Sequence, residues 1–533
     1  MADAGTDSAD NEEAEAFFPA NSVELAELQK EVTVGDTEDS TTTHNTSAAT
    51  ESPTSIWPRM RDGFKLDLTE DNRRIAVELE WYARNQSYLN RTFLRAERYL
   101  HHIVEEVEKR NIPMEMALLP VVESAFDPFA YSHGRASGIW QFIPGTGKMY
   151  GLKQDWWYDG RRDVVASTDA ALNYLDHLAG RFDGDWQHAL ASYNSGGGTV
   201  SKAIRLNTSK GKPTDFWSLK LPRETRAYVP KLIAIAKIVA DPEKYGVTLP
   251  HIDNKPQFEV INAESQIDLA QAAKLAEIDL NDLYLLNPGF NRWATPPLGP
   301  HKLAIPIAQA DIFRQNLSAL PKDQRVNWQR YKVKSGDSLI SISKKHHTTP
   351  QVIKDVNKLR SSFIRIGDTL LIPVATKSLD QYALSAGSRL ETTQSKYTGT
   401  PGLAKIDYEV RSGDTLWDLS RKYSVGVRSL AKWNGIAPTD PLKPKQKLVI
   451  WSKAGPQKAS TQNINVASNQ IPSSRTMIRK INYRVRSGDS LARIADKFNV
   501  RVSDIVGWNK INPKTYLQPG QRLTLHVDIA SGY

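Results

Sequence analysis

The acidic side chain best placed for chemistry in this chain is Glu123, in the stretch Val121-Val122-Glu123-Ser124-Ala125-Phe126. It directly follows Met116-Ala117-Leu118-Leu119-Pro120, a run that folded proteins normally bury. Apolar surroundings raise the pKa of a carboxyl group, because a low dielectric penalises its charged form. A carboxyl that keeps its proton near neutral pH can act as a general acid. We therefore expect Glu123 to be a catalytic acid, against the alternative of a Glu that faces solvent beside a core helix.

Three further motifs follow Glu123 along the chain. Ser132 lies nine residues after it and Gln141 nine residues later, within Ser132-His133-Gly134-Arg135-Ala136-Ser137-Gly138-Ile139-Trp140-Gln141-Phe142-Ile143. The other two are Ala191-Ser192-Tyr193-Asn194-Ser195-Gly196 and Glu224-Thr225-Arg226-Ala227-Tyr228-Val229. Trp140 and Phe142 are expected in the core rather than under a sugar.

Taken together, these motifs resemble those of the goose-type-lysozyme-like lytic transglycosylases. The resemblance implies that Glu123 protonates the glycosidic oxygen between N-acetylmuramic acid and N-acetylglucosamine, and then takes the proton of the muramic acid 6-hydroxyl as that oxygen attacks C1. The product implied by the resemblance is a 1,6-anhydromuramyl end, and the expected enzyme is therefore a carbon–oxygen lyase that consumes no water. Ordinary glycosidases use two carboxylates instead.

The same resemblance assigns supporting roles to five polar residues. It implies that four of them orient the substrate or Glu123: Ser132, Gln141, Tyr193 and Asn194. Among these, the Tyr193 hydroxyl is expected to hydrogen-bond Glu123. Glu224 is expected to be a supporting carboxylate, with a structural partnership to a nearby Arg as the open alternative.

The C-terminal part of the chain contains an internal repeat. Tyr331-Lys332-Val333-Lys334-Ser335-Gly336-Asp337-Ser338-Leu339 recurs from Tyr408 and again from Tyr483. An Asn follows each Tyr by 26 positions, and a short β-like run closes each copy. This pattern predicts a β-α-α-β unit of about 45 residues, in which Asp or the next Ser/Thr of the Ser-Gly-Asp turn caps the first helix.

These repeats resemble LysM modules, which implies that they bind N-acetylglucosamine in a shallow groove between the opening turn and the second helix. The residues assigned to glycan binding are Gly336, Asp337, Gly413, Asp414, Gly488, Asp489, Asn357, Asn434 and Asn509. Spacer modules that bind nothing are the alternative. In the first copy Val356 replaces the Trp found at Trp433 and Trp508. The first copy is therefore expected to differ from the other two in its affinity for the glycan.

The chain is expected to be multidomain, with an all-α lysozyme-like catalytic domain followed by small α+β modules on flexible linkers. Apolar residues at three- and four-residue spacing predict helices from Trp57 to about Pro250, including one that follows Thr168-Asp169, one capped by Asp185 and a stop at Gly196-Gly197-Gly198. We call 57–250 the catalytic block, 258–306 the diverged module, and 330–373, 407–451 and 482–527 the first, second and third repeats. Residues 1–56 are expected to be a disordered acidic tail, and 374–405 and 453–480 flexible tethers.

Composition limits the other possibilities. The net charge is +9, but residues 1–40 hold 12 Asp/Glu and one Lys, so the rest carries +20 and favours a polyanionic partner. The chain has no cysteine, which excludes disulfides, thiol nucleophiles and a lipid-linked Cys. No apolar run approaches the length of a membrane span, and Met1-Ala2-Asp3-Ala4-Gly5-Thr6 resembles no signal peptide. Neither a metal site nor a cofactor is expected.

The expected partner is peptidoglycan, and the substrate implies the periplasm or cell envelope although no export signal is present. We expect a monomer. Three alternatives stay open: an inactive wall-binding scaffold, a muramidase-type hydrolase on the same fold, and a nucleic-acid binder, which rests on the basic charge alone.

Overall fold

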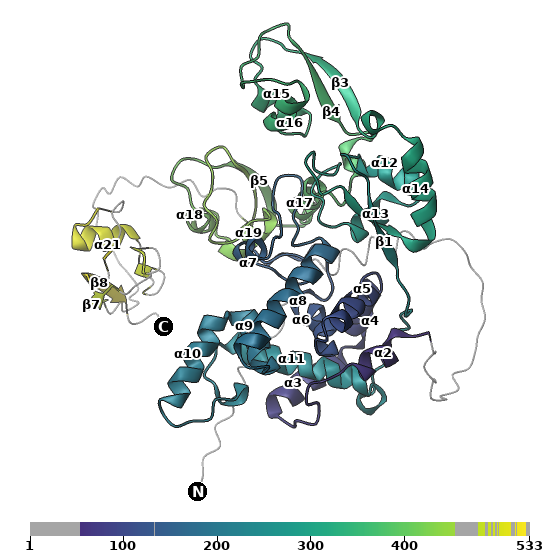
Figure 1. The fold of residues 1–533 in the computed structure, drawn as a ribbon. Helices are drawn as coiled ribbons and strands as arrows, with labels where there is room; N and C mark the ends of the chain where they lie inside the picture. Colours follow the sequence, from purple (N-terminus) through teal and green to yellow (C-terminus); the bar gives the residue numbers. More distant parts are fainter. Residues whose placement is uncertain are drawn as a thin grey trace. The chain divides into compact units, whose positions relative to one another are not determined.

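The computed structural model describes residues 54–132, 134–453, 478–485, 489–491, 494, 495, 498, 500, 502–512, 517, 518 and 520–528. The chain forms two compact units, Met1–Gln457 and Lys458–Tyr533. The first holds the catalytic block, the diverged module and the first two repeats (Figure 1). Of the expected disordered tail 1–56, residues 1–53 lie outside the described residues, whereas Ser55 and Ile56 are buried and Ile56 begins a helix, so the folded block starts earlier than predicted. Of the expected tether 453–480, residues 454–477 lie outside the described residues, whereas Ile478 already begins a strand.

The catalytic block is helical, as the sequence predicts. Its α-helices are α2 (Ile56–Asp62), α3 (Arg73–Arg84), α4 (Gln86–Ala96), α5 (Leu100–Lys109), α6 (Leu119–Ser124), α7 (Pro144–Met149), α8 (Val164–Arg181), α9 (Trp186–Ser195), α10 (Gly197–Thr208) and α11 (Arg223–Ala240). Short 3₁₀ turns are η2 (Met114–Leu118), η3 (Phe216–Ser218) and η4 (Glu243–Tyr245). Within the described part of this block the β-structure consists of isolated bridges only.

Helix α11 is the central element of the block. Most of its side chains from Tyr228 onward are buried, and it packs against α3, α9 and α6. An apolar helix of this kind is stable only inside a core, because almost its whole circumference avoids water. Its position brings Tyr228 next to α6, the short helix that carries Glu123.

Two helix boundaries differ from the sequence-based prediction. Helix α8 begins at Val164 instead of after Thr168-Asp169, because the Asp163 side chain accepts a hydrogen bond from the Ala166 amide and caps the helix earlier. Asp185 caps α9 as expected, and Gly196 ends it at φ 83°. Gly197 and Gly198 do not extend that stop, since α10 starts at Gly197.

The four modules each pair an opening strand with a closing strand in antiparallel register. The diverged module has β1 (Phe258–Asn262), α12 (Leu269–Ala276), α13 (Leu280–Leu286) and β2 (Lys302–Pro306), followed by η5 (Ile307–Gln309), α14 (Ala310–Ala319) and η6 (Lys322–Gln324). The first repeat has β3 (Asn327–Lys332), α15 (Leu339–Lys345), α16 (Pro350–Val356) and β4 (Thr369–Val374). The second has β5 (Ala404–Glu409), α18 (Leu416–Lys422), α19 (Val427–Trp433) and β6 (Lys447–Ser452). The third has β7 (Ile478–Arg484), α21 (Val502–Asn509) and β8 (Arg522–Asp528).

The register of the repeats is the same. The Tyr that opens each motif faces a Leu of the closing strand, in the pairs Tyr331–Leu370, Tyr408–Leu448 and Tyr483–Leu523. Each of the three repeats has an apolar cluster of its own, and the first repeat in addition shares side chains with the diverged module. The predicted fold class, an all-α domain followed by small βααβ modules, is therefore confirmed.

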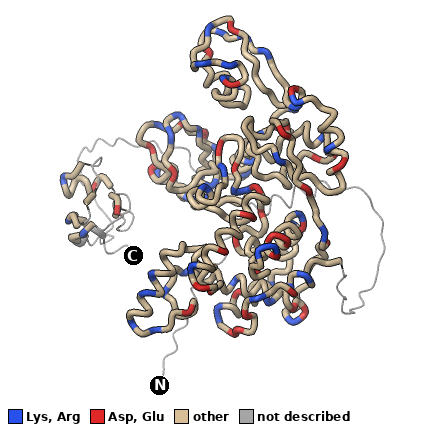
Figure 2. The backbone as a smooth tube through the Cα atoms, in the orientation of Figure 1, with Lys and Arg blue, Asp and Glu red and all other residues tan. Residues whose placement is uncertain are grey.

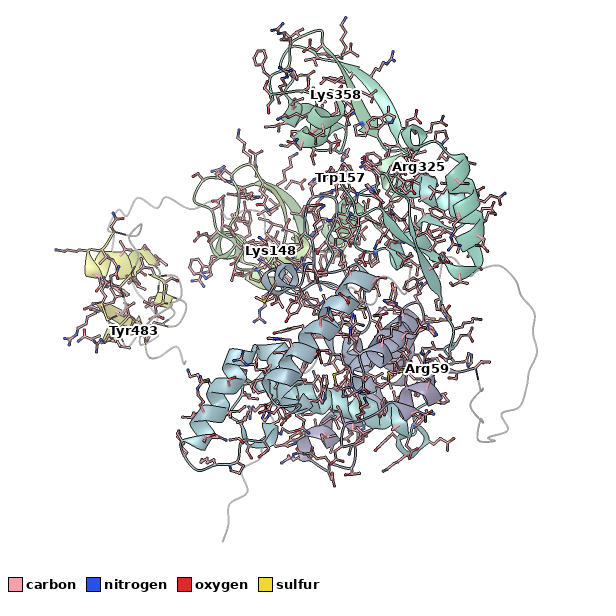
Figure 3. The ribbon with its side chains drawn as sticks, in the orientation of Figure 1. Arg59, Lys148, Trp157, Arg325, Lys358 and Tyr483 are labelled. Carbon is pink, nitrogen blue, oxygen red and sulfur yellow. The ribbon has the colours of Figure 1, made fainter. Side chains whose placement is uncertain are left out.

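The diverged module also shares its core with the catalytic block. Trp157 and Tyr158 of the block lie in one buried cluster with Phe290 and Trp293 of the module. In Figure 3 Trp157 and Arg325 are labelled near the elements of the diverged module. Val352 and Val356 of α16 reach the same cluster. The Val at position 356, where the other repeats have Trp, thus packs the first repeat onto its neighbour.

The expected flexible tether over 374–405 is wrong in one respect, because much of this segment is folded. It contains η7 (Leu379–Gln381) and α17 (Ala386–Ser395). Tyr382 is 0% exposed and Leu384 is buried against the diverged module. Its polar composition suggested a solvated chain, but two apolar side chains and a few tertiary hydrogen bonds are enough to fix it.

Candidate active site

Glu123 lies in the last turn of α6, which continues directly from η2. Nearly all side chains of these two elements are buried, as the apolar run before Glu123 predicts. The helix ends because Ala125 adopts φ 50° and donates its amide proton to Pro120 and Val121 carbonyls. A carboxylate beside a helix C-terminus meets the negative end of the helix dipole, which disfavours its charge.

The carboxyl group of Glu123 accepts a short hydrogen bond from the hydroxyl of Tyr228 on α11. This bond links α6 to α11 across the site. Glu123 is only half-buried as a whole residue, so solvent or a ligand can reach it, although protein atoms surround the carboxyl closely. The group is therefore both sheltered and accessible.

Burial raises the pKa of Glu123 to about 8. The hydrogen bond from Tyr228 opposes this by stabilising the charged form, and the negative charge of Glu224 adds to the increase. At neutral pH the carboxyl keeps its proton. This protonation state is the one that a general acid needs, and it agrees with the expectation drawn from the apolar run.

Ser132 and Gln141 lie on the segment 130–143, which we call the active-site loop. The Ser132 hydroxyl accepts hydrogen bonds from the amides of Gly134 and Ala136, at 3.2 and 3.0 Å. The Gln141 amide donates to the carbonyl of Gly138 at 2.7 Å. Both side chains therefore shape the loop in this structure, and their contact with a substrate remains a prediction.

The active-site loop is tied to α6 and to the core. The hydroxyl of Ser124, the residue after Glu123, donates to the carbonyl of Ile139 at 3.0 Å. Trp140 and Phe142 are buried, as expected, and the Trp140 indole donates to Thr168 at 3.0 Å. Hydrogen bonds and buried side chains thus connect the active-site loop with α6 and with the core.

Tyr193 does not make the hydrogen bond that the resemblance implied. Its hydroxyl donates to the carbonyl of Trp140 at 2.9 Å, whereas Tyr228 takes the place beside Glu123. Burial raises the pKa of Tyr193 well above its usual value, and the charge of Glu123 adds to this, so the two groups are neighbours. Tyr193 therefore holds the active-site loop in place through the Trp140 carbonyl, and it is Tyr228 that bonds the Glu123 carboxyl.

Asn194 and Glu224 lie at the junction of α9 and α11. The Asn194 side-chain oxygen accepts from the hydroxyl of Thr225 at 2.8 Å. Glu224 is exposed in the first turn of α11, where the helix dipole favours a negative charge. It influences Glu123 through its charge alone, so its role as a supporting carboxylate remains a prediction.

Two further residues shape the site although the sequence predicts no role for them. Tyr228 lies one helical turn after Glu224 in the same motif. Arg161 forms a two-point ion pair with Asp159, and it donates to the carbonyls of Arg135 and Phe142 at 2.6 and 3.2 Å. Burial raises the pKa of Asp159, yet its bonds to Arg161 and Arg162 outweigh this and lower it overall. No local sequence signal marks Arg161.

In the repeats, the Asp of each opening turn seals that turn. Asp337 accepts from the Tyr331 hydroxyl at 2.9 Å and from the Lys334 amide at 2.8 Å, and Asp414 makes the same two bonds with Tyr408 and Arg411. The helix cap is instead the next residue, Ser338 or Thr415.

Two other features recur in the opening turns: a glycine with positive φ, and a hydrogen bond from the Tyr hydroxyl to the Asp carboxylate. Gly336 and Gly413 sit at φ 84° and 92°, where side chains are strained. In the third repeat Asp489 accepts from the Tyr483 hydroxyl at 2.7 Å, and Gly488 lies outside the described residues.

The Asn of each repeat joins the second helix to the closing strand. Asn434 donates to the carbonyls of Leu430 and Val449 and accepts from the Val449 amide. Asn357 and Asn509 make equivalent bonds. Asn287 does the same in the diverged module, which places that module in the repeat series. These three-bond contacts give the Asn side chains a structural role, and glycan contact by the Asn residues and the turns remains a prediction.

Charges and metal-binding groups are distributed without a dominant cluster. Figure 2 shows Lys and Arg interleaved with Asp and Glu along the described chain. Among the described residues no group of three or more His, Asp or Glu side chains is arranged to hold a metal ion. None of the described helices is long and apolar enough to cross a membrane.

Comparisons with protein families match most of the folded chain. Residues 102–216 match the Transglycosylase SLT domain, and residues 257–322 match the LysM-like domain of lytic transglycosylase MltD. The LysM domain matches three times, over residues 331–373, 408–451 and 483–525.

Curated proteins give a long match. The chain is 40% identical over 408 residues to membrane-bound lytic murein transglycosylase D of Escherichia coli (strain K12), covering 75% of this chain and 86% of that protein. The protein of the same name from Escherichia coli O6:H1 matches equally. Among solved structures, the 70 kDa soluble lytic transglycosylase of Escherichia coli is 22% identical, with a TM-score of 0.24, over 32% of this chain and 30% of that one. This structural similarity is too weak to support a conclusion about fold or function.

Proposed function

The chain belongs to the family of membrane-bound lytic murein transglycosylase D, and from this premise we propose that Glu123 is the acid and base of its reaction. The activity is that of a lytic murein transglycosylase, which cleaves the β-1,4 bond between N-acetylmuramic acid and N-acetylglucosamine. The LysM repeats bind the same polymer. The observation that carries the residue assignment is the raised pKa of Glu123, about 8, in a half-buried position.

In the proposed first step, protonated Glu123 gives its proton to the bridging oxygen as the bond from that oxygen to C1 of muramic acid breaks. Positive charge develops on the muramic acid ring. The Tyr228 hydroxyl, which hydrogen-bonds the carboxyl, stabilises the carboxylate that Glu123 becomes.

In the proposed second step, the Glu123 carboxylate takes the proton of the muramic acid 6-hydroxyl while its oxygen bonds to C1. This forms the 1,6-anhydro ring and returns Glu123 to its protonated state. A second catalytic carboxylate is not needed, since the substrate supplies the nucleophile. Glu224 contributes only its charge, which helps to keep Glu123 protonated.

Substitution of Glu123 by Gln tests the assignment, because the amide has the same shape but no acidic proton. Product mass spectrometry on purified murein sacculi should show anhydromuramyl ends for the native chain and a loss of about 10²–10⁴-fold or more for the variant. Sacculus binding should persist. Reducing ends instead of anhydro ends would show a muramidase-type hydrolase, and full activity in the variant would remove Glu123 from its role.

We further propose that the enzyme acts as a monomer in the cell envelope. The support is that α6, α11 and the active-site loop all come from one chain, and that the substrate is a wall polymer. Sedimentation of the purified chain with and without solubilised glycan tests the oligomeric state.

A further inference from the structure

The segment between the first and second repeats fastens the second repeat to the rest of the first unit. The Tyr382 hydroxyl donates to both carboxylate oxygens of Asp268 at 2.9 Å. On α17, the Arg389 guanidinium lies over the Phe129 ring of the catalytic block, 4.1 Å from its centroid. The amide of Ala386 donates to the carbonyl of Asn291 at 3.0 Å. Helix α17 is thus anchored on its N-terminal side.

The C-terminal end of α17 is anchored to the second repeat. The Gln394 amide donates to the side-chain oxygen of Asn434 at 3.1 Å, and the Trp451 indole donates to the Gln394 carbonyl at 3.0 Å. The Tyr397 ring then packs edge-on against Trp433 and Trp451. A module held in this way has lost the orientational freedom that a flexible tether would allow.

A direct contact joins the second repeat to the active-site loop. The guanidinium of Arg135 forms an ion pair with the carboxylate of Asp440. The backbone of Arg135 is itself fixed by Arg161. Burial raises the pKa of the neighbouring Tyr131 and the charge of Asp440 adds to this, so Asp440 lies close to the loop through more than one residue.

Asp440 belongs to the connection between α19 and β6, which borders the opening turn of its repeat. The Val410 amide donates to the Gln446 carbonyl at 2.9 Å, and the Lys445 amide donates to the Val410 carbonyl at 2.8 Å. Trp417, at the start of α18 beside the same turn, is 39% exposed. The connection that contacts the active-site loop through Asp440 is therefore also hydrogen-bonded to the residue that leads into the opening turn.

We propose that the second repeat is a fixed substrate-binding element of the catalytic block, which holds the same glycan strand that Glu123 cleaves. The Arg135–Asp440 ion pair and α17 keep it in register with the active-site loop. A glycan strand bound both at the second repeat and at the active site lies in a fixed position relative to Glu123. Binding then avoids the entropy cost of positioning a tethered module. The proposal rests on the transglycosylase function above, and it distinguishes the second repeat from an independent wall anchor.

Cross-linking in the full chain tests the docking without using activity. Because the chain has no cysteine, Gly134→Cys and Thr439→Cys introduce the only two thiols, one beside each partner of the ion pair. Both positions are exposed, and a Cβ at Gly134 meets only the Ser132 hydroxyl at an ordinary 3.6 Å. A short bismaleimide should join them intramolecularly. Adding Asp440→Arg should reduce the yield several-fold, and adding Arg135→Glu as well should restore it.

Kinetics on long and short substrates test the shared strand. In Asp440→Arg, like charges meet at the contact, so KM for long uncrosslinked glycan strands should rise about five- to tenfold, with a smaller effect on kcat. KM for a murein tetrasaccharide should change much less. The double variant Arg135→Glu/Asp440→Arg should return the ratio of the two KM values toward that of the native chain.

The outcomes separate the two proposals. If the native chain forms no anhydro product, the proposed function fails. If it forms product but the cysteines do not cross-link, or if they cross-link and the KM ratio is the same in Asp440→Arg, the second repeat is not a substrate-binding element and only this inference is overturned.

Discussion

The hydroxyl of Tyr228 on α11 hydrogen-bonds the carboxyl of Glu123 on α6, across 105 positions of sequence. This bond lowers the pKa of Glu123, whereas burial raises it, and burial prevails at about 8. Tyr228 therefore sets where the acid titrates, and it is ready to stabilise the carboxylate that forms when the proton leaves. The balance between these two effects can be measured.

Replacing Tyr228 by Phe should shift the alkaline limb of the pH–rate profile. The reaction needs protonated Glu123, so kcat/KM in the native chain should fall as pH rises through about 8. Without the hydroxyl, the charged form loses its stabilising bond, the pKa of Glu123 rises further and the limb moves to higher pH. The rate at neutral pH should fall about tenfold or more, because the carboxylate formed in the first step is less stable.

Tyr82→Phe is the matched control for this experiment. Tyr82 is a buried tyrosine on α3, and its hydroxyl is not bonded to Glu123. Its profile should keep the native alkaline limb. A limb that stays in place in Tyr228→Phe, or moves to lower pH, would contradict the role given to Tyr228.

Replacing Glu123 by Gln should make the catalytic block more stable at alkaline pH. The pKa of Glu123 rises from 4.5 to about 8 on folding. A raised folded-state pKa means that the stabilising contribution is complete below pH 4.5 and is lost as pH rises through about 8. The amide does not titrate, so the variant should gain on the native chain over this window, by a few degrees of Tm at pH 8.

Scanning calorimetry at pH 5 and pH 8 measures this difference. Glu243→Gln, at an exposed position in η4, provides the control and should follow the native chain at both pH values. Equal Tm differences for Glu123→Gln at the two pH values would mean that the carboxyl is not sheltered.

Gly138→Ala should inactivate the enzyme. Gly138 sits at φ 80° in the active-site loop, and a Cβ there would overlap the carbonyl oxygen of Arg161. The loop would have to move away from Arg161 and from Ser124, which contacts it through Ile139. Anhydro product should drop by at least about 10²-fold, because small displacements of a catalytic arrangement have large effects.

Gly145→Ala is the control for that substitution. Gly145 lies in α7, has no positive φ and leaves open space around an added Cβ. Its activity should stay near that of the native chain, and its stability should rise slightly. If Gly138→Ala kept full activity, the loop would not need its present path.

Asn434→Ala should loosen the second repeat without a direct effect on sugar contact. The substitution leaves the Leu430 and Val449 backbone groups without their partner, at a cost of about 1–3 kcal/mol. Hydrogen exchange of the β5 and β6 amides in the full chain should accelerate. Lys443→Ala, at an exposed position in the same repeat, should leave exchange unchanged. Lost glycan affinity with native exchange rates would return Asn434 to the glycan site.

Local patterns in the sequence were sufficient for several features. The apolar run before Glu123 marks a buried helix, and burial is the largest of the effects that act on the pKa of its carboxyl. The period of the Tyr, Gly-Asp and Asn positions marks the repeats, because each repeat is a small folding unit whose turn, caps and strand pair depend on nearby residues. The Ser or Thr after the Ser-Gly-Asp turn, one of the two residues predicted to cap the first helix, is the cap in the first two repeats.

Assignments that depended on partners distant in sequence fared less well. Tyr193 and Tyr228 are both tyrosines in polar motifs, and nothing local says which one reaches Glu123. The packing of α11 against α6 decides it, since that contact places Tyr228 at the carboxyl and leaves Tyr193 under Trp140. Likewise, the polar segment around α17 has the composition of a tether, and only its contacts with Asp268 and Phe129 show that it is fixed.

Sequence alone was enough to predict a sheltered carboxyl at Glu123 and the series of modules, because these follow from short-range patterns of burial and turn geometry. Tertiary structure alone decided which hydroxyl tunes Glu123, and that Arg135 of the active-site loop meets Asp440 of the second repeat. Both contacts join residues more than a hundred positions apart, and such pairs are chosen by how whole elements pack rather than by any neighbour along the chain.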